Sequence, residues 1–169
     1  GFQALADKKN ISLNTIVPHT CPVALDYDKT QRIFVNLVFN AIKFTTDDGA
    51  VSVKLVKQGD ELHLEVTDSV PGIPKERRSS VFERFSRIED TAHTETGTGL
   101  GLSIVQEFST LQNGTVEVRN SELGGACFAI DLPREIEAPT GGLNEEKVYR
   151  DPLLQALYDQ DYKPIVRKR

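Results

Sequence analysis

Two pairs of short segments alternate apolar and polar residues, and a glycine-containing turn separates the members of each pair. In the first pair, around Gln58-Gly59, the apolar positions are Val51, Val53, Leu55, Leu62, Leu64 and Val66. In the second pair, around Gly124-Gly125, they are Val116, Val118, Ala126, Phe128, Ile130 and Leu132. Such an alternation is typical of strands that bury one face. The sequence therefore predicts two β-hairpins, and residues 11–17 predict one more strand, ended by Pro18.

Two other segments repeat apolar residues at the spacing of a helix. We expect one helix over residues 28–45, capped by Asp28, and another over residues 100–111 that stops near Asn113-Gly114. Antiparallel hairpins with helices between them predict an α/β two-layer sandwich. In this fold a mixed, mostly antiparallel sheet is covered on one face by helices.

The apolar and polar patterning weakens after about residue 134 of the 169-residue chain. We therefore expect one domain over residues 1–134, which is an ordinary size for a single domain. Residues 135–169 are interpreted as an extension of unknown role, with a linker over 135–148 and a short helix over 153–158.

Composition excludes several classes of function. The formal net charge of -5 argues against a basic nucleic-acid-binding surface. No apolar run is long enough to insert into a membrane. The two cysteines, Cys21 and Cys127, lie far apart and indicate no disulfide framework, so we expect a cytoplasmic location.

Polar side chains interrupt one face of the first predicted helix. Asn36, Asn40 and Lys43 are spaced i, i+4 and i+7, so they share a face. Asparagine is a poor residue for a helix interior. This face offers amide oxygens to a hard cation such as Mg²⁺ and an ammonium group to a phosphate. The alternative is a polar stripe that faces water.

A carboxylate ends the first predicted hairpin. Asp68 lies just before Pro71-Gly72, which fits the centre of a type II turn. At this place the carboxylate can accept a hydrogen bond from the amino group of a base. The alternative is an aspartate that caps the turn.

Three alternating glycines, Gly97, Gly99 and Gly101, begin the second predicted helix. They free backbone N–H groups to approach an anion at the positive end of that helix. A dinucleotide-binding turn would have the spacing G-x-G-x-x-G after a strand, which this segment lacks. The polar residues 86–96 precede it instead and predict a mobile lid.

The order and intervals of these motifs resemble the catalytic and ATP-binding domain of sensor histidine kinases. This domain belongs to the superfamily shared with gyrase, Hsp90 and MutL, and the resemblance covers about residues 5–134. Residues 36–45 resemble the N box, 68–74 the first glycine box, 81–85 the F box and 97–103 the second glycine box. The resemblance implies a Bergerat-type ATP-binding fold with ATP and Mg²⁺ as cofactors.

The resemblance also implies residue roles. Asn40 would bind Mg²⁺, Lys43 would reach the phosphates, and Asn36 would help to orient the γ-phosphate; Asn36 and Lys43 are thus the candidate catalytic residues. Asp68 would accept the adenine amino group. The implied nucleotide-binding residues are Asn40, Lys43, Asp68, Gly72, Ile73, Gly97, Thr98, Gly99, Leu100, Gly101 and Leu102.

The F box carries two aromatic and two basic candidates. We expect Phe82 and Phe85 to pack as core beneath the lid rather than to contact nucleotide. Arg84 and Arg87 would either approach phosphates or form solvated ion pairs with nearby acidic residues.

Val70 departs from the family pattern, because the first glycine box usually has glycine there. A β-branched residue resists positive φ, so we expect a strained or displaced turn and weaker ATP binding.

The motifs together with Val70 leave two candidate functions. The first is the ATP-binding module of a two-component sensor histidine kinase, and the second is a degenerate, non-catalytic signalling module that docks to a partner. ATPase chaperones are a distant third, because their catalytic helix usually carries a glutamate base.

The histidine that accepts the phosphate is expected outside this chain. None of His19, His63 and His93 is predicted to lie on a helix beside an acidic residue. The resemblance implies an upstream helical domain that carries the phosphoacceptor and dimerises. It also implies a homodimeric parent protein, with or without a membrane anchor, and a response regulator receiver domain as partner.

Overall fold

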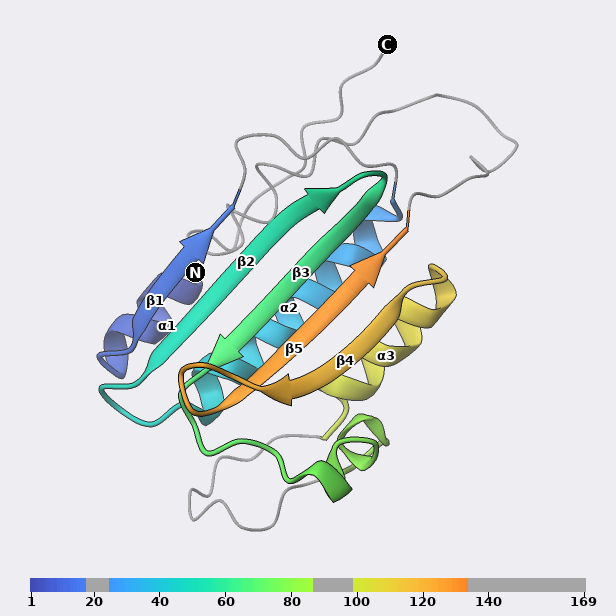
Figure 1. Ribbon diagram of the computed structural model, residues 1–169. Coiled ribbons are helices and arrows are strands. Elements are labelled where there is room, and N and C mark those ends of the chain that lie inside the picture. Colours follow the sequence, from blue (N-terminus) through green and yellow to red (C-terminus); the bar gives the residue numbers. More distant parts are fainter. Residues whose placement is uncertain (18–24, 87–98, 134–169) are drawn as a thin grey trace.

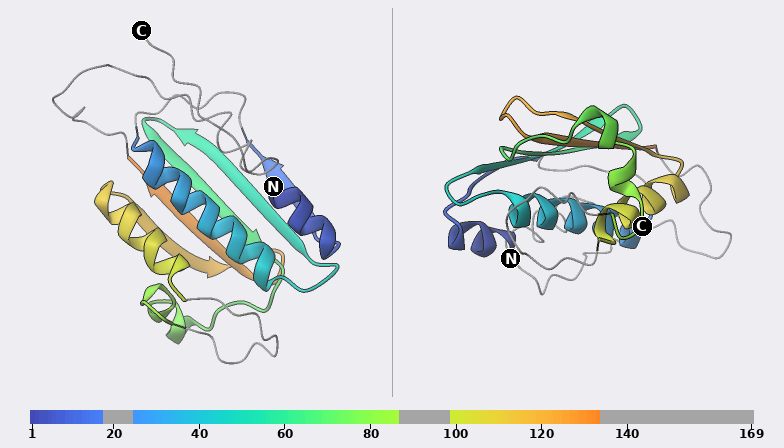
Figure 2. Two further views of the ribbon diagram at one scale, coloured as in Figure 1. Left: turned by 180° about the vertical axis from the view of Figure 1, so that it is seen from behind. Right: turned by 90° about the horizontal axis from the view of Figure 1, so that it is seen from below.

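The computed structural model describes residues 1–17, 25–86 and 99–133, and these residues form two layers (Figure 1). One layer is a five-stranded sheet in the order β1-β2-β3-β5-β4. The other consists of the three α-helices of the described residues, which all lie on the same face of the sheet (Figure 2). This arrangement confirms the predicted sandwich.

Two antiparallel hairpins form most of the sheet, as predicted. The strands are β1 (Ser12–Ile16), β2 (Ala50–Gln58), β3 (Glu61–Asp68), β4 (Thr115–Asn120) and β5 (Ala126–Leu132). β3 also pairs with β5 in antiparallel register, which joins the two hairpins. β1 pairs with β2 in parallel and makes the sheet mixed.

The main core lies between the sheet and α2 (Tyr27–Phe44). The helix buries one apolar face, on which Ile33, Phe34, Leu37 and Val38 are at most 2% exposed. Its N-cap is Asp26, whose side chain accepts a 3.0 Å hydrogen bond from the Lys29 N–H. The predicted cap, Asp28, is wrong: it lies inside the first turn, where its negative charge still favours the helix dipole.

The other two helices flank α2 (Figure 2). α3 (Gly101–Leu111) was predicted, whereas α1 (Phe2–Lys8) was not. The predicted stop after α3 is confirmed, and the positive φ of 56° falls on Asn113. Two short 3₁₀ turns, η1 (Lys75–Arg77) and η2 (Ser80–Phe82), connect β3 towards α3.

Some sequence predictions concern residues outside the described ranges. These are the strand end at Pro18, most of the lid over 86–96, and the linker and helix beyond residue 134. The domain boundary at 134 therefore stays a prediction. Among the described helices, none is both long and apolar enough to cross a membrane.

Candidate functional site

The motif residues gather at one end of the sandwich. The second half of α2, the end of β3, the β4–β5 turn and the start of α3 all lie there (Figure 1). This end therefore unites three motifs whose residues, such as Asn36 and Gly101, are more than 60 positions apart in the chain.

The first contact at this end is between α2 and α3. A Cβ atom built on Gly101 would lie 3.1 Å from Asn36 Oδ1 and 3.4 Å from Asn40 Nδ2. Glycine at this position thus lets the N-terminus of α3 approach the two amides closely. The structure brings Asn36, Asn40 and Gly101 together, as the motif prediction requires.

The two amides differ in their own hydrogen bonds. Asn36 Nδ2 donates a 2.7 Å bond to the Arg32 carbonyl, one turn earlier, so its Oδ1 is the atom beside Gly101. The Asn40 side chain is half-buried and has no hydrogen-bond partner among the described residues. Its amide oxygen is therefore available to a ligand near the positive end of α3.

Lys43 is placed differently from the two asparagines. Its ammonium group lies 5.2 Å from the centre of the Phe44 ring, within range of a cation–π contact. No hydrogen bond or ion pair joins Lys43 to α3 in the described part of the chain. The predicted role of Lys43 towards phosphate stays a prediction.

The second glycine box is described from Gly99 onwards, and Gly97 and Thr98 lie outside the described residues. Gly99 has a φ of +69°, and a Cβ there would lie 2.9 Å from the Phe85 Cα. The Phe85 N–H donates a 3.0 Å bond to the Gly99 carbonyl. Leu100 forms the N-cap of α3, and Leu102 packs against the core. The glycine thus fixes the entry of the chain into α3.

Asp68 is only 9% exposed at the end of β3. Its Oδ1 accepts hydrogen bonds of 3.1 Å from the Val70 N–H and from the Ala126 N–H. Burial raises the pKa of Asp68, although both bonds favour the charged form. Its Oδ2 has no hydrogen-bond partner among the described residues, so one oxygen is held and the other can accept a bond from a ligand.

The type II turn expected after Asp68 is wrong, and the strain expected at Val70 is absent, while the displaced turn and the weaker ATP binding stay predictions. Gly72 does not adopt the positive φ that a type II turn requires. Val70 does not have a positive φ either, so it carries no such strain. Glycine is needed at position 72 for space instead. A Cβ there would lie 3.0 Å from the Gly125 carbonyl oxygen and 3.1 Å from Asn120 Oδ1. Ile73, the next residue, is 8% exposed and belongs to the small core beside η2.

No pattern in the sequence indicated the role of the β4–β5 turn. A Cβ on Gly125 would overlap Asp68 Oδ1 and the carbonyl oxygens of Asp68 and Val70. Ser121, in the same turn, donates a 2.9 Å bond to the Asp68 carbonyl. β3 pairs with β5 so that Thr67 lies opposite Cys127, and this pairing brings the turn beside Asp68. The sequence prediction lacked this pairing between the two hairpins.

The F box divides into a buried and an exposed part. Phe82 is 7% exposed and meets Phe128 edge to face, which confirms the expected core role. Phe85 is 71% exposed, so the expected core role is wrong for it. Arg84 forms an exposed ion pair with Glu107 at 3.5 Å, and Arg87 lies outside the described residues.

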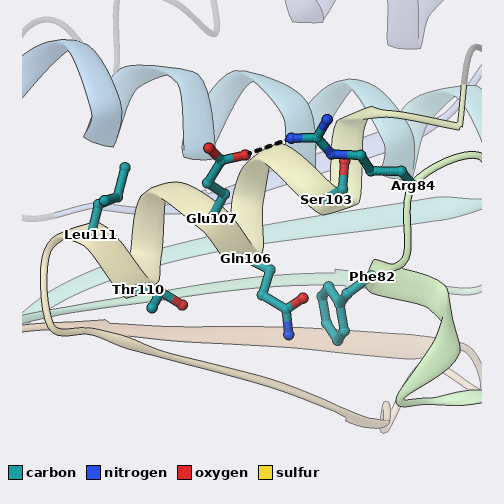
Figure 3. A pocket seen from close by; sticks show the side chains of 7 residues that line it. All are labelled: Phe82, Arg84, Ser103, Gln106, Glu107, Thr110 and Leu111. Carbon is teal, nitrogen blue, oxygen red and sulfur yellow. Dashed lines mark hydrogen bonds and ion pairs between the residues drawn. The ribbon is translucent and has the colours of Figure 1, made fainter.

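A separate open pocket of about 400 Å³ lies beside α3 (Figure 3). Its lining residues are Phe82, Arg84, Ser103, Gln106, Glu107, Thr110 and Leu111. None of Asn36, Asn40 and Asp68 lines it. This pocket is therefore not the site that the motifs build.

His63 lies on β3 and not on a helix. Its Nδ1 lies 2.6 Å from Asp131 Oδ1, and its Nε2 lies 3.0 Å from Glu65 Oε1. Burial opposes the charged form, but these two carboxylates outweigh it and raise the pKa of His63. Of the three histidines, only His63 lies in the described residues. Its two ring nitrogens are engaged by Asp131 and Glu65 of the same sheet.

The two-layer fold, with a buried carboxylate at a strand end and two amides against a glycine, is the arrangement expected of a nucleotide-binding domain of the two-layer ATPase class. A family model described as histidine kinase-, DNA gyrase B-, and HSP90-like ATPase matches residues 25–136. The chain belongs to this family.

Similar proteins place the chain among the sensor kinases of that family. Sensor histidine kinase TmoS of Ectopseudomonas mendocina is 40% identical over 142 residues, which are 83% of this chain and 14% of TmoS. Sensor protein RstB of Escherichia coli is 36% identical over 133 residues, which are 78% of this chain and 30% of RstB. The chain thus spans less than a third of either relative.

Solved structures agree. The mycobacterial sensor histidine kinase MprB has a TM-score of 0.68 and 29% identity, over 79% of this chain and 90% of that chain. Full-length ShkA in complex with AMPPNP has a TM-score of 0.66 and 29% identity, over 80% of this chain and 28% of that chain. The chain is therefore an ATP-binding domain of the sensor histidine kinase type, as its motifs predicted.

Proposed function

We propose that this chain is the catalytic module of a two-component sensor histidine kinase. It supplies the γ-phosphate of ATP to a histidine on a helical dimerisation domain outside the chain. The observation that carries the proposal is the close approach of Asn36 and Asn40 to Gly101 at the end of the sandwich where Asp68 also lies.

The adenine end of the proposed site depends on Asp68. Its Oδ2 accepts a hydrogen bond from the exocyclic amino group, while Oδ1 stays on the N–H groups of Val70 and Ala126. Gly72 and Ile73 follow in the loop beneath the base. Because the partners of Oδ1 are backbone groups, the Asp68 carboxylate needs no rearrangement to bind the adenine amino group.

The phosphate end depends on α2 and the start of α3. The Asn40 amide oxygen is a hard ligand without a competing partner among the described residues, so it fits Mg²⁺. Mg²⁺, when bound, neutralises phosphate charge. Asn36 and Lys43 orient the γ-phosphate, and backbone N–H groups of residues 97–102 hold the phosphates at the positive end of α3. Catalysis of this kind consists mainly of positioning.

The wider assignment follows the same proposal. Residues 1–134 form the ATP-binding domain, and residues 135–169 form an extension. The parent protein is a homodimer that works on ATP in the cytoplasm and passes phosphate to a response regulator receiver domain. The great length of TmoS and RstB beyond the matched residues supports such further domains.

The degenerate signalling module is the second candidate. It rests on Val70, and the backbone of Val70 lacks the positive φ that would have strained it. That observation favours the ATP-binding module over the degenerate one.

Asn40→Ala tests the proposal. Calorimetric titration with AMPPNP, with and without Mg²⁺, should show that the wild-type chain binds the nucleotide more tightly when Mg²⁺ is present. In the Asn40→Ala variant, the affinity in the presence of Mg²⁺ should be about tenfold lower or weaker still. Asn14→Ala, which removes an exposed amide on β1, is the matched control and should bind normally. In the parent protein, Asn40→Ala should abolish phosphohistidine formation from ATP. Unchanged metal-dependent affinity in a folded Asn40→Ala variant would remove Asn40 from the site.

A further inference from the structure

Ser121 is the centre of a small hydrogen-bond network in the β4–β5 turn. Its hydroxyl donates a 2.9 Å bond to the Asp68 carbonyl oxygen. The Ser121 Oγ itself accepts bonds from the Leu123 N–H at 2.9 Å and the Gly125 N–H at 3.2 Å. One half-buried hydroxyl thus closes its own turn and attaches that turn to the end of β3.

The β4–β5 turn also orients the Asp68 carboxylate. Ala126, the residue after the turn, donates its N–H to Asp68 Oδ1 at 3.1 Å. Gly125 is buried, and it packs so closely on Asp68 that a Cβ would overlap the Asp68 carboxylate. A shift of this turn therefore moves the one side-chain oxygen that the fold holds, and with it the direction of Oδ2.

We propose that Ser121 is a positioning residue for adenine recognition, which it serves by fixing the β4–β5 turn against Asp68. This inference rests on the proposed function, in which Asp68 accepts a hydrogen bond from the adenine amino group. Ser121 itself does not touch the nucleotide. Its removal weakens recognition of the amino group and leaves binding of the sugar and phosphates.

The test compares two nucleotides that differ only in the amino group. One is ATP, and the other is the triphosphate of purine riboside, in which a hydrogen atom replaces that group. The 169-residue chain is titrated with each in the presence of Mg²⁺. A hydrogen bond to a charged carboxylate predicts that the wild-type chain prefers ATP by about tenfold or more.

Three variants separate positioning from a general loss of structure. Ser121→Ala should reduce the preference for ATP to about threefold or less, mainly through weaker ATP binding. Ser121→Thr keeps the hydroxyl and should retain the preference. Ser80→Ala is the matched control, because it removes another hydroxyl that donates to a backbone carbonyl, at Arg77, away from Asp68.

The outcomes distinguish this inference from the proposed function. Equal binding of both nucleotides by the wild-type chain would overturn the proposed role of Asp68. A wild-type preference that Ser121→Ala keeps would overturn the positioning role and leave Asp68 in place. If thermal unfolding shows that Ser121→Ala does not fold, Ser121→Cys replaces it. A weaker preference of Ser121→Cys for ATP supports the positioning role, and a preference as strong as that of the wild-type chain overturns it.

Discussion

The two ends of the proposed nucleotide site differ in how completely the fold alone prepares them. At the base end, Asp68 is 9% exposed, and backbone N–H groups of two segments bind its Oδ1. At the phosphate end, Asn40 is half-buried and has no hydrogen-bond partner among the described residues. The base end is thus completed when β3 pairs with β5, whereas the phosphate end offers side chains that a ligand has to engage.

The difference has a physical origin. The Ala126 N–H lies on a paired strand and cannot move without breaking the sheet, so it holds the carboxylate at little cost in side-chain entropy. An amide on a helix surface keeps its rotamer freedom until a metal or phosphate binds it. The base end is therefore expected to control stability together with binding, and the phosphate end to control binding alone.

The largest effect is expected from Gly125→Ala at the base end. The new methyl group would overlap Asp68 and Val70, and overpacking of this kind costs about 1–3 kcal/mol of folding free energy. ATP affinity should fall as well. Ser80→Ala is the control, because it changes a half-buried residue of a turn away from Asp68 and adds no atoms. Urea denaturation that shows Gly125→Ala to be no more destabilising than Ser80→Ala would contradict the close packing.

Gly101→Ala should separate stability from binding at the phosphate end. Alanine favours a helix over glycine by about 1 kcal/mol in a helix interior, so stability should stay equal or rise slightly. The new Cβ would crowd Asn36 and Asn40, and Mg²⁺-dependent AMPPNP affinity should fall by about tenfold. Denaturation and calorimetry on the same sample measure both. Unchanged affinity would mean that the two amides do not bind the nucleotide from this position.

Val70→Gly tests whether the base end is already relaxed. Val70 has no positive φ, so glycine relieves no strain there and only adds freedom to the unfolded chain. We expect a loss of about 0.5–1 kcal/mol in unfolding free energy and no gain in ATP affinity. Tighter ATP binding by the variant would show that Val70 narrows the pocket.

The smallest effect is expected from His63→Gln, far along β3 from Asp68. The pKa of His63 is raised above its ordinary 6.5, so its stabilising effect is full below pH 6.5 and is lost as the pH rises through the raised value. Hydrogen bonding to His63 and the charge of Arg119 outweigh burial and lower the pKa of Glu65 below its ordinary 4.5. Glu65 therefore contributes fully above pH 4.5 and loses its effect as the pH falls through the lowered value.

The difference in stability between wild type and His63→Gln should thus be largest between about pH 4.5 and 6.5 and should shrink above it. Nucleotide affinity at pH 7 should not change, because this network lies outside the proposed site. Denaturation curves across this pH range measure the difference. A difference that grows above pH 7 would contradict the raised pKa of His63.

Local patterns in the sequence predicted most of the fold. Strict alternation predicted β2, β3, β4 and β5. β2 and β3 bury alternate residues as expected, whereas β5 also buries Cys127 and Ala129 on its other face. The motif residues Asn36, Asn40 and Gly101 were predicted because chemistry restricts their types, and the structure brings them together. The roles of the individual site residues stay predictions.

The failure at the turn after Asp68 comes from long-range contacts that no local pattern encodes, whereas the helix cap was a choice between two residues that both fit. Gly72 and Gly125 face each other across segments more than 50 residues apart, so their need for space was invisible, and Pro71-Gly72 was interpreted as a type II turn instead. Asp28 and Asp26 both fit a helix start, and only the geometry of the Lys29 N–H decides between them. Phe85 has a large apolar side chain, as core residues do, but this side chain is exposed.

Amide hydrogen exchange tests the difference between the two ends most directly. The N–H groups of Val70 and Ala126 donate to Asp68, so they should be protected already in the nucleotide-free chain. The N–H groups of Gly101, Leu102 and Ser103 begin α3 and lack intrahelical acceptors. They should become protected only when Mg²⁺ and AMPPNP are added. Fast exchange at Val70 and Ala126 in the free chain, with protection appearing only on nucleotide binding, would contradict a base end that the fold prepares by itself.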